Sequence, residues 1–249
     1  MTKKIIFTSG GTGGHIFPAM NLMKYFDSKK IEVLLVSDNK GDKFLKRNTN
    51  FRSIIINAST PTNKNIFNKI FSYVDIFFSK IKSIIILKKE KPNLIFGLGG
   101  FVSFPISLAS RIFKIPLMIY ENNIVLGRAN KILLPFCEKI FLGSKIPINF
   151  PKKYIHKTEQ VGHILSNNIL EYSPAISKNE NTSLSILVLG GSQGAEIFGK
   201  FIPPAIKIIK DKGYNIKIAQ QCTKLQKDSI KLFYNKNNIE NKIFDFTDN

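Results

Sequence analysis

The sequence predicts an α/β protein with two doubly wound domains around parallel sheets, the second of them incomplete. Three observations predict this class. Short apolar runs alternate with longer amphipathic stretches along the 249 residues, as in repeated strand–helix units. Three of the apolar runs lead directly into glycine-rich turns, and a polar segment divides the first two of these turns from the third.

The apolar runs predict eight strands, and the amphipathic stretches between them predict seven helices. The strands are expected at Lys4–Thr8, Val33–Ser37, Ser53–Ile56, Leu94–Gly97, Leu117–Tyr120, Lys139–Leu142, Ser185–Leu189 and Ile216–Ala219. The helices are expected at Phe17–Lys29, Asp42–Asn48, Ile66–Lys89, Ser103–Phe113, Leu126–Leu134, Ala195–Lys212 and Leu225–Asn235.

The domain boundaries follow from a polar segment late in the chain. We expect a first domain at residues 1–165, a linker at 166–183 and a second domain at 184–249. The most polar part of the linker, Glu171–Ser183, carries a proline, three serines and two asparagines. The second domain has 66 residues, whereas an α/β domain usually has about 100 or more. We therefore expect it to be partial.

The composition is strongly basic, with 37 Lys and Arg against 17 Asp and Glu and a net charge of +20. An excess of this size favours anionic partners such as phosphorylated substrates, acidic lipids or nucleic acid. A compositional drift toward lysine on solvated faces explains it equally well. No nucleic-acid recognition motif or basic–aromatic platform is present, which weighs against nucleic acid. The two cysteines match no metal or redox spacing.

The first glycine motif, Ser9–His15 (SGGTGGH), follows the first strand and precedes a helix. Glycines let a ligand approach the backbone, and a helix N-terminus offers free N–H groups, so this is a candidate phosphate site. His15 lies at the carboxyl edge of the sheet, where it can act as a general base. The spacing is not Gly-x-Gly-x-x-Gly, which disfavours the alternative of a nucleotide-dependent oxidoreductase with Asp38 as the acidic residue after its second strand.

Three further motifs follow other strands. Gly97–Ser103 (GLGGFVS) predicts either a second phosphate-binding loop or a tight turn with no ligand. Tyr120–Asn123 (YENN) ends an apolar strand and predicts the polar lining of a cleft. Gly190–Ala195 (GGSQGA) repeats the strand, glycine loop and helix in the second domain. Together they predict a cleft that joins two phosphate-bearing molecules.

The helix expected at Ile66–Lys89 has an apolar face wider than packing on one side of a sheet needs. Its polar positions form one narrow stripe: Asn68, Ser72, Asp75, Ser79 and Lys82/Ser83. Basic residues flank or follow it: Lys80, Lys82, Lys88, Lys89 and Lys91. The pattern predicts either contact with an anionic membrane surface or burial under a neighbouring element.

The motifs GGTGGH, GLGGFVS, YENN and GGSQGA occur in this order, and together they resemble the MurG family of peptidoglycan synthesis from Lys4 to the last residue. The resemblance implies the GT-B fold, with an acceptor-lipid domain followed by a UDP-sugar domain. It implies inverting transfer of N-acetylglucosamine from UDP-N-acetylglucosamine to the muramyl 4-hydroxyl of undecaprenyl-diphospho-muramoylpentapeptide, which converts lipid I to lipid II. No obligatory cofactor or metal is implied, and the expected location is peripheral, at the cytoplasmic face of the bacterial inner membrane.

The resemblance also assigns residues. It implies that His15 is the candidate base. Donor contacts are implied for Thr12, Gly13, Gly14, Asn123, Ser166, Ser192 and Thr247, and acceptor-diphosphate contacts for Gly10, Gly11, Gly99 and Gly100. Ser166 stands where the family carries an arginine, and the family's later donor-binding motifs have no counterpart here. A non-catalytic copy that binds only the lipid diphosphate therefore remains an alternative.

Overall fold

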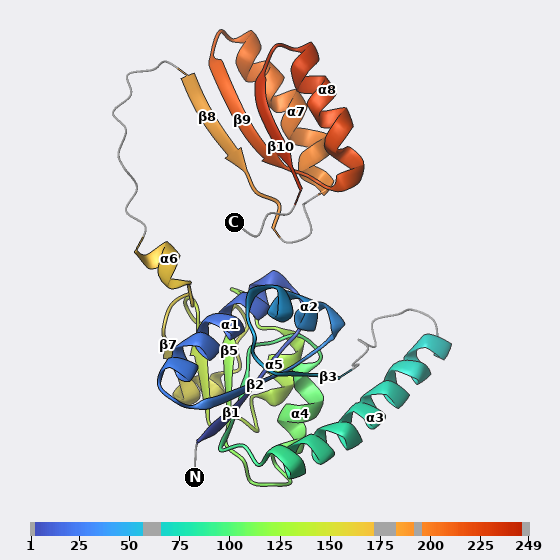
Figure 1. Cartoon of the computed structure of the whole chain (residues 1–249), viewed down its shortest axis with the longest axis vertical. Coiled ribbons are helices and arrows are strands. Elements are labelled where there is room, and N and C mark those ends of the chain that lie inside the picture. The colour runs from blue at the N-terminus through green and yellow to red at the C-terminus, as the bar shows by residue number, and fades with distance from the viewer. Residues whose placement is uncertain (1–2, 57–65, 172–182, 192–195, 246–249) are drawn as a thin grey trace. The chain divides into compact units, whose positions relative to one another are not determined.

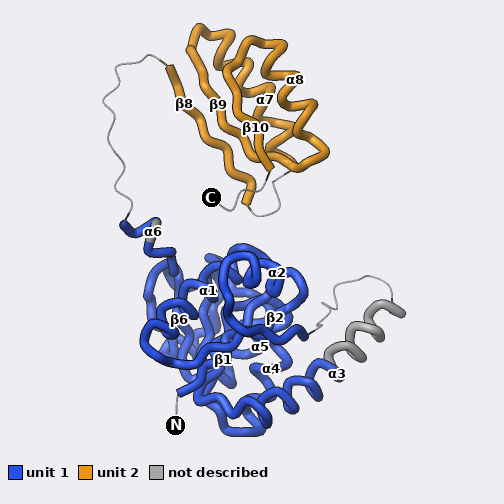
Figure 2. The backbone as a smooth tube through the Cα atoms, in the orientation of Figure 1, with its two compact units in different colours: residues 1–172 blue, residues 173–249 orange. Residues whose placement is uncertain are grey.

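The computed structural model describes residues 3–56, 66–171, 183–191 and 196–245, with the backbone alone at 66–77 and at Asn168. The chain divides into two compact units, residues 1–172 and 173–249 (Figure 2). The boundary falls inside the segment expected as a linker, which also contains one helical turn, α6 (Asn167–Leu170).

The first unit contains a seven-stranded sheet in which every neighbouring pair is parallel (Figure 1). Its strands are β1 (Lys4–Ser9), β2 (Glu32–Ser37), β3 (Ser53–Ile55), β4 (Leu94–Gly97), β5 (Leu117–Glu121), β6 (Lys139–Leu142) and β7 (Thr158–Gln160). They lie in the order β3-β2-β1-β4-β5-β6-β7. The order reverses between β1 and β4, and ligands of open α/β sheets bind at the carboxyl end of such a switch point.

Helices cover both faces of this sheet because successive strand residues point to opposite sides. Phe7 packs with α1 (Gly13–Ser28) and α2 (Asn39–Asn48) on one face. Ile6 packs with α3 (Ile66–Glu90), α4 (Ser103–Ala109) and α5 (Arg128–Leu133) on the other. A 3-10 helix at Lys152–Lys157 precedes β7.

The second unit has a parallel sheet in the order β10-β9-β8, with two helices packed on one face (Figure 1). Its elements are β8 (Ser183–Val188), α7 (Glu196–Asp211), β9 (Asn215–Gln221), a 3-10 turn at Lys224–Gln226, α8 (Lys227–Lys236) and β10 (Glu240–Phe244). Ile206, Ile218 and Tyr234 lie at the centre of its core.

The α/β class and all eight predicted strands are confirmed, while two strands and several helix ends differ from the prediction. The strands β7 and β10 were not predicted, since the first has three polar residues and the second mixes polar and apolar ones. Helix α1 begins at Gly13 and not at Phe17, because the N–H groups of His15 and Ile16 donate to the Thr12 carbonyl. Helix α4 ends at Ala109, where turns follow.

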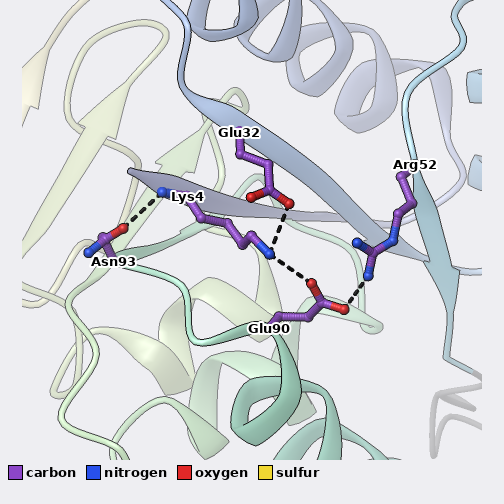
Figure 3. Close-up of polar contacts among 5 residues, drawn as sticks. All are labelled: Lys4, Glu32, Arg52, Glu90 and Asn93. Atoms are coloured by element: carbon purple, nitrogen blue, oxygen red, sulfur yellow. Dashed lines mark hydrogen bonds and ion pairs between the residues drawn. The ribbon is translucent and has the colours of Figure 1, made fainter. Parts of the chain in front are cut away.

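A buried carboxylate ties the end of α3 to the amino edge of the sheet (Figure 3). Glu90 accepts a hydrogen bond from Lys4 Nζ at 3.0 Å and another from Arg52. Lys4 Nζ also pairs with Glu32 at 2.8 Å, and its backbone N–H donates to the Asn93 side chain. These contacts fix α3 against β1 and β2 at the edge opposite the glycine loops.

Candidate active site

The two glycine loops of the first unit meet at the switch point between β1 and β4. The Gly10 N–H donates to the Gly99 carbonyl at 2.9 Å. Gly99 and Gly100 have φ of +96° and +80°, a region that L side chains rarely adopt. A Cβ on Gly100 would lie 2.5 Å from the Gly10 Cα, so both loops need glycine to pack this closely.

Asp38 holds the first loop from the neighbouring strand. One carboxylate oxygen accepts from the Gly11 N–H at 3.0 Å, and the other accepts from the Gly41 N–H at 2.8 Å, which caps α2. Both oxygens are therefore bonded to the protein's own backbone. Asp38 therefore fixes the first glycine loop against the start of α2.

His15 lies in the first turn of α1, half-buried, with its ring against the second loop. A Cβ on Gly99 would lie 2.8 Å from His15 Cε1, so the ring fills the space beside that glycine. Burial lowers the pKa of His15, while the charge of Glu121 and the Leu98 carbonyl act in the opposite direction. The imidazole is therefore neutral at pH 7 and able to accept a proton.

Glu121 ends β5 and is 2% exposed. Its carboxylate accepts four hydrogen bonds, two on each oxygen. One oxygen accepts from the backbone N–H and the side chain of Asn123, both at 3.0 Å. The other accepts from the Gly127 N–H at 2.8 Å and from Asn130 Nδ2 at 3.0 Å. This single side chain fixes the loop between β5 and α5.

These elements enclose a pocket of about 240 Å³ beside the His15 ring. It is lined by His15, Gly99, Gly100, Phe101, Glu121, Asn123, Gly127, Arg128, Ala129 and Asn130. Among the described residues, four buried side-chain polar atoms lack a hydrogen-bond partner, and His15 Nδ1 and Asn130 Oδ1 are two of them. Polar atoms of this kind are typical of a site that takes a ligand or ordered water.

A second hollow, of about 590 Å³, is lined by residues that include Asn122, Asn123 and His163. Asn122 Oδ1 lies 2.8 Å from His163 Nδ1 and accepts from the Tyr120 hydroxyl at 3.1 Å. Asn123 lines both hollows. The prediction that Tyr120 lines the cleft is wrong, because its side chain is buried in the core. Its hydroxyl lies within hydrogen-bond distance of Asn122 Oδ1 and of the Gly162 carbonyl.

The structure brings part of the predicted site together. His15, Gly99, Gly100 and Asn123 surround the smaller pocket, and Gly10 packs against Gly100. At the start of α1 and in the loop before it, Thr12 and Gly14 are exposed, while Gly11 and Gly13 are buried.

Other predicted residues lie elsewhere. Ser166 lines a separate hollow of about 330 Å³ on the outer side of α1, with Lys24 and Tyr25. Ser192 and Thr247 lie outside the described residues. No cluster of three or more His, Cys, Asp or Glu side chains suited to a metal occurs in the part of the chain that the structure describes.

Two pocket residues, Arg128 and Asn130, were not predicted. They follow the YENN motif by five and seven residues, after a glycine, and belong to the helix expected at Leu126–Leu134, whose amphipathic pattern predicts a helix but marks no site. Their position in the chain could have indicated them. The loop that follows the strand ending in YENN lies at the carboxyl edge of the sheet, where ligands of α/β proteins bind.

Comparison with known proteins gives consistent matches along the chain. The glycosyltransferase family 28 N-terminal domain matches residues 5–142, and the C-terminal domain of that family matches residues 185–249. The UDP-N-acetylglucosamine–N-acetylmuramyl-(pentapeptide) pyrophosphoryl-undecaprenol N-acetylglucosamine transferase of Pelagibacter ubique is 35% identical over 248 residues, which cover 100% of this chain and 68% of the relative. The enzyme of the same name from Francisella tularensis is 36% identical over 93% of this chain and 64% of its own length.

The crystal structure of Acinetobacter baumannii MurG is similar across the whole chain and 69% of its own length, with a TM-score of 0.72 and 23% sequence identity. This likeness confirms the GT-B fold. The chain spans about two thirds of the length of these proteins. By the residues matched and by its identity to these relatives, the chain belongs to glycosyltransferase family 28 and, within it, to the MurG family of N-acetylglucosamine transferases.

Proposed function

We propose that this chain binds a lipid-linked muramyl acceptor and UDP-N-acetylglucosamine and transfers N-acetylglucosamine between them, converting lipid I to lipid II. The observation that carries the proposal is the contact of two glycine loops beside the half-buried ring of His15. Glycine backbone suits phosphate, and a neutral imidazole suits proton abstraction from a hydroxyl. A transferase that joins a nucleotide sugar to a diphospholipid needs both.

In the proposed reaction His15 takes the proton of the acceptor's 4-hydroxyl. The oxygen attacks the anomeric carbon of the donor, the new C–O bond forms, and the bond from that carbon to the UDP oxygen breaks. UDP leaves with the electron pair, and the configuration inverts. The transition state resembles an oxocarbenium ion, so positioning and stabilisation of the leaving diphosphate provide most of the acceleration.

The remaining site assignments are part of the same proposal. Gly10, Gly11, Gly99 and Gly100 form the acceptor-diphosphate site. Gly99 and Gly100 line the pocket, and Gly10 and Gly11, whose N–H groups donate to Gly99 and Asp38, hold the loops in place. The exposed start of α1 with Asn123 contacts the donor. Further donor contacts are assigned to Ser166, Ser192 and Thr247 from the family pattern. Ser166 offers a hydroxyl at the position of the family arginine, and we therefore expect weaker donor binding than in family members that carry the arginine.

We also propose that α3 docks on an anionic membrane surface, where the lipid acceptor resides. Ser79 and Ser83, two members of the narrow polar stripe expected on this helix, are buried against the domain. The outward face carries apolar side chains: Phe78 is 64% exposed and Ile85 is 61% exposed. A helix whose small polar residues face the core and whose large apolar residues face out is suited to an interface between water and lipid.

Basic side chains border this apolar face. Exposed lysines stand beside it and at its end: Lys80, Lys82, Lys88 and Lys89. Each lysine near an anionic leaflet contributes about 1 kcal/mol of attraction. No helix in the described parts of the chain is long and apolar enough to cross a membrane.

The first experiment is calorimetric titration of this chain with UDP-N-acetylglucosamine and, separately, with a short-chain diphospho-muramyl-pentapeptide acceptor. Binding of both ligands is expected for a transferase, and product formation is then assayed with labelled donor. Acceptor binding without donor binding would instead identify a copy that binds only the lipid diphosphate. Failure to bind either ligand would refute the proposal.

The role of His15 is tested with His15→Gln, which removes the base but retains a polar side chain. We expect turnover to fall about 10²–10⁴-fold, the usual contribution of a general base, with acceptor affinity nearly unchanged. His156→Gln, at an exposed histidine of the 3-10 helix before β7, is the control and should leave turnover unchanged. Equal losses of turnover and acceptor affinity would refute the base assignment.

A further inference from the structure

We propose that Arg128 is the cation that binds the acceptor's diphosphate, at the rim of the pocket beside His15. The inference rests on the proposed function and adds to it a charged residue that neither the sequence motifs nor the glycine loops supply. The glycine loops offer only backbone N–H groups, and those of Gly10 and Gly11 already donate to Gly99 and Asp38. Burial lowers the pKa of His15, which disfavours a positive charge on its ring. A diphosphate held by these alone would have no countercharge in the pocket.

Arg128 is held in place by buried bonds on both sides. The preceding residue, Gly127, donates its N–H to Glu121, and Asn130, two residues later, donates its side chain to the same carboxylate oxygen. Asn130 also donates to the Tyr120 carbonyl at 3.1 Å and is almost fully buried. The backbone that carries Arg128 is therefore fixed relative to the pocket, although its side chain is exposed.

The charges of the pocket residues indicate where an anion binds, namely at Arg128. Arg128 is the only lining residue with a permanent positive charge, and Glu121 is the only one with a negative charge. The Glu121 carboxylate already accepts four hydrogen bonds. The Arg128 guanidinium, by contrast, has no hydrogen bond or ion pair to any residue in the described parts of the chain, and its donors are available to a ligand.

The chemistry of the pocket favours a diphosphate. A guanidinium binds phosphate oxygens through two parallel hydrogen bonds, which a lysine cannot do. Gly99 and Gly100 line the same pocket without side chains, so phosphate oxygens can approach their backbone. A pocket of about 240 Å³ lies below the usual range of roughly 300–1,000 Å³ for small-molecule sites, so it suits one group of a larger ligand.

The test compares Arg128→Gln, Arg128→Lys and the control Lys131→Gln by calorimetric titration. Lys131 is exposed on the same short helix and lies outside the pocket lining. The probes are the short-chain diphospho-muramyl-pentapeptide acceptor, the muramyl pentapeptide without diphosphate or lipid, and UDP-N-acetylglucosamine. Thermal unfolding of each variant confirms that the fold is retained.

We expect Arg128→Gln to weaken binding of the diphospho acceptor about 10- to 100-fold, the range for loss of charge-assisted hydrogen bonds. Arg128→Lys should give an intermediate loss, and Lys131→Gln should stay within about twofold, as expected of an exposed charge outside the site. Binding of UDP-N-acetylglucosamine should not change with any variant.

Two results would overturn the inference. In the first, Arg128→Gln binds the diphospho acceptor as tightly as Lys131→Gln does. In the second, Arg128→Gln loses as much affinity for the muramyl pentapeptide without diphosphate as for the diphospho acceptor, which would mean that Arg128 contacts the peptide or the sugar. Both differ from failure of the proposed function, in which the unsubstituted chain itself would not bind the diphospho acceptor.

Discussion

The buried carboxylate of Glu90 allows a quantitative test of what holds the first unit together. Its side chain is 4% exposed and bonds Lys4, whose side chain is 16% exposed, and Arg52, whose side chain is 53% exposed. Glu90→Gln keeps the shape and one acceptor oxygen but removes the negative charge. It also turns an amide NH₂ toward one of the two cations, so that two donors face each other.

The expected loss follows from these contacts. A hydrogen bond to a charged group contributes about 1.5–3 kcal/mol, which applies to the Lys4 contact. The Arg52 contact is discounted to about 0–1 kcal/mol because that side chain is more than half exposed. Lys4 keeps its second partner, Glu32, so its loss lies at the low end. We expect the free energy of unfolding to fall by about 2 kcal/mol, and Tm to fall by about 4–8 °C.

Thermal and urea unfolding, followed by circular dichroism at pH 7, measures this loss. The control is Glu159→Gln, which breaks the Lys139–Glu159 pair; their side chains are 55% and 48% exposed, and the expected loss is below about 0.5 kcal/mol. A loss below about 0.5 kcal/mol for Glu90→Gln as well would show that the buried charge is not a net source of stability.

The pH dependence gives a second arm to the same test. Burial alone would raise the pKa of Glu90, but the hydrogen bonds and charges of Lys4 and Arg52 lower it overall. A lowered pKa means that the stabilisation is complete above pH 4.5, the ordinary glutamate value, and is lost as the pH falls through the folded-state pKa. The difference between the unsubstituted chain and Glu90→Gln should therefore shrink below about pH 4. A difference that persists undiminished to pH 3 would contradict the ionic origin.

Three further predictions concern the site and the membrane surface. Gly100→Ala adds a Cβ at φ +80° against the first glycine loop, so it should abolish acceptor binding and lower the free energy of unfolding by about 1–3 kcal/mol or more. The control Gly162→Ala, at φ +83° with nothing within 4 Å of the new Cβ, should lower stability without affecting acceptor binding. Calorimetric titration measures the binding, and thermal unfolding measures the stability. Ile85→Asp should reduce co-sedimentation with anionic vesicles several-fold, and the exposed-leucine control Leu232→Asp should not. Because burial lowers the pKa of His15, turnover should be constant at neutral pH and fall in acid with a midpoint below 6.5; a midpoint at or above 6.5 would contradict this.

The sequence predicted the fold well because its strongest signals are local. Buried parallel strands are short apolar runs, and eight of them were recognisable. The strands that escaped prediction have polar residues at alternate or successive positions: β7 is Thr-Glu-Gln, and β10 begins with Glu-Asn-Lys. In both, pairing with a neighbouring strand, which no local pattern contains, determines the structure.

The sequence indicated those candidate site residues that belong to a single local motif. His15 and the two glycine loops were identified from their position after strands. The roles of Glu121 and Arg128 were not, because they depend on contacts across a loop of six residues. The helix α3 illustrates a different limit: its sequence groups Ser79 and Ser83 in one polar stripe but does not show which way that stripe faces, and in the structure both serines face the core. Polarity predicts exposure poorly for side chains small enough to pack in an interior.

The geometry of Glu121 implies that donor binding, acceptor binding and proton transfer are coupled. The same carboxylate holds Asn123, which we assign to the donor, and Gly127, which precedes the residue we assign to the acceptor diphosphate. Its charge also acts on His15, opposing the lowering of the histidine pKa by burial. A change at Glu121 would therefore shift all three together, whereas changes at Asn123, Arg128 or His15 should separate them. The buried carboxylate is best understood as the element that aligns the two substrates with the base, with no part in the bond exchange itself.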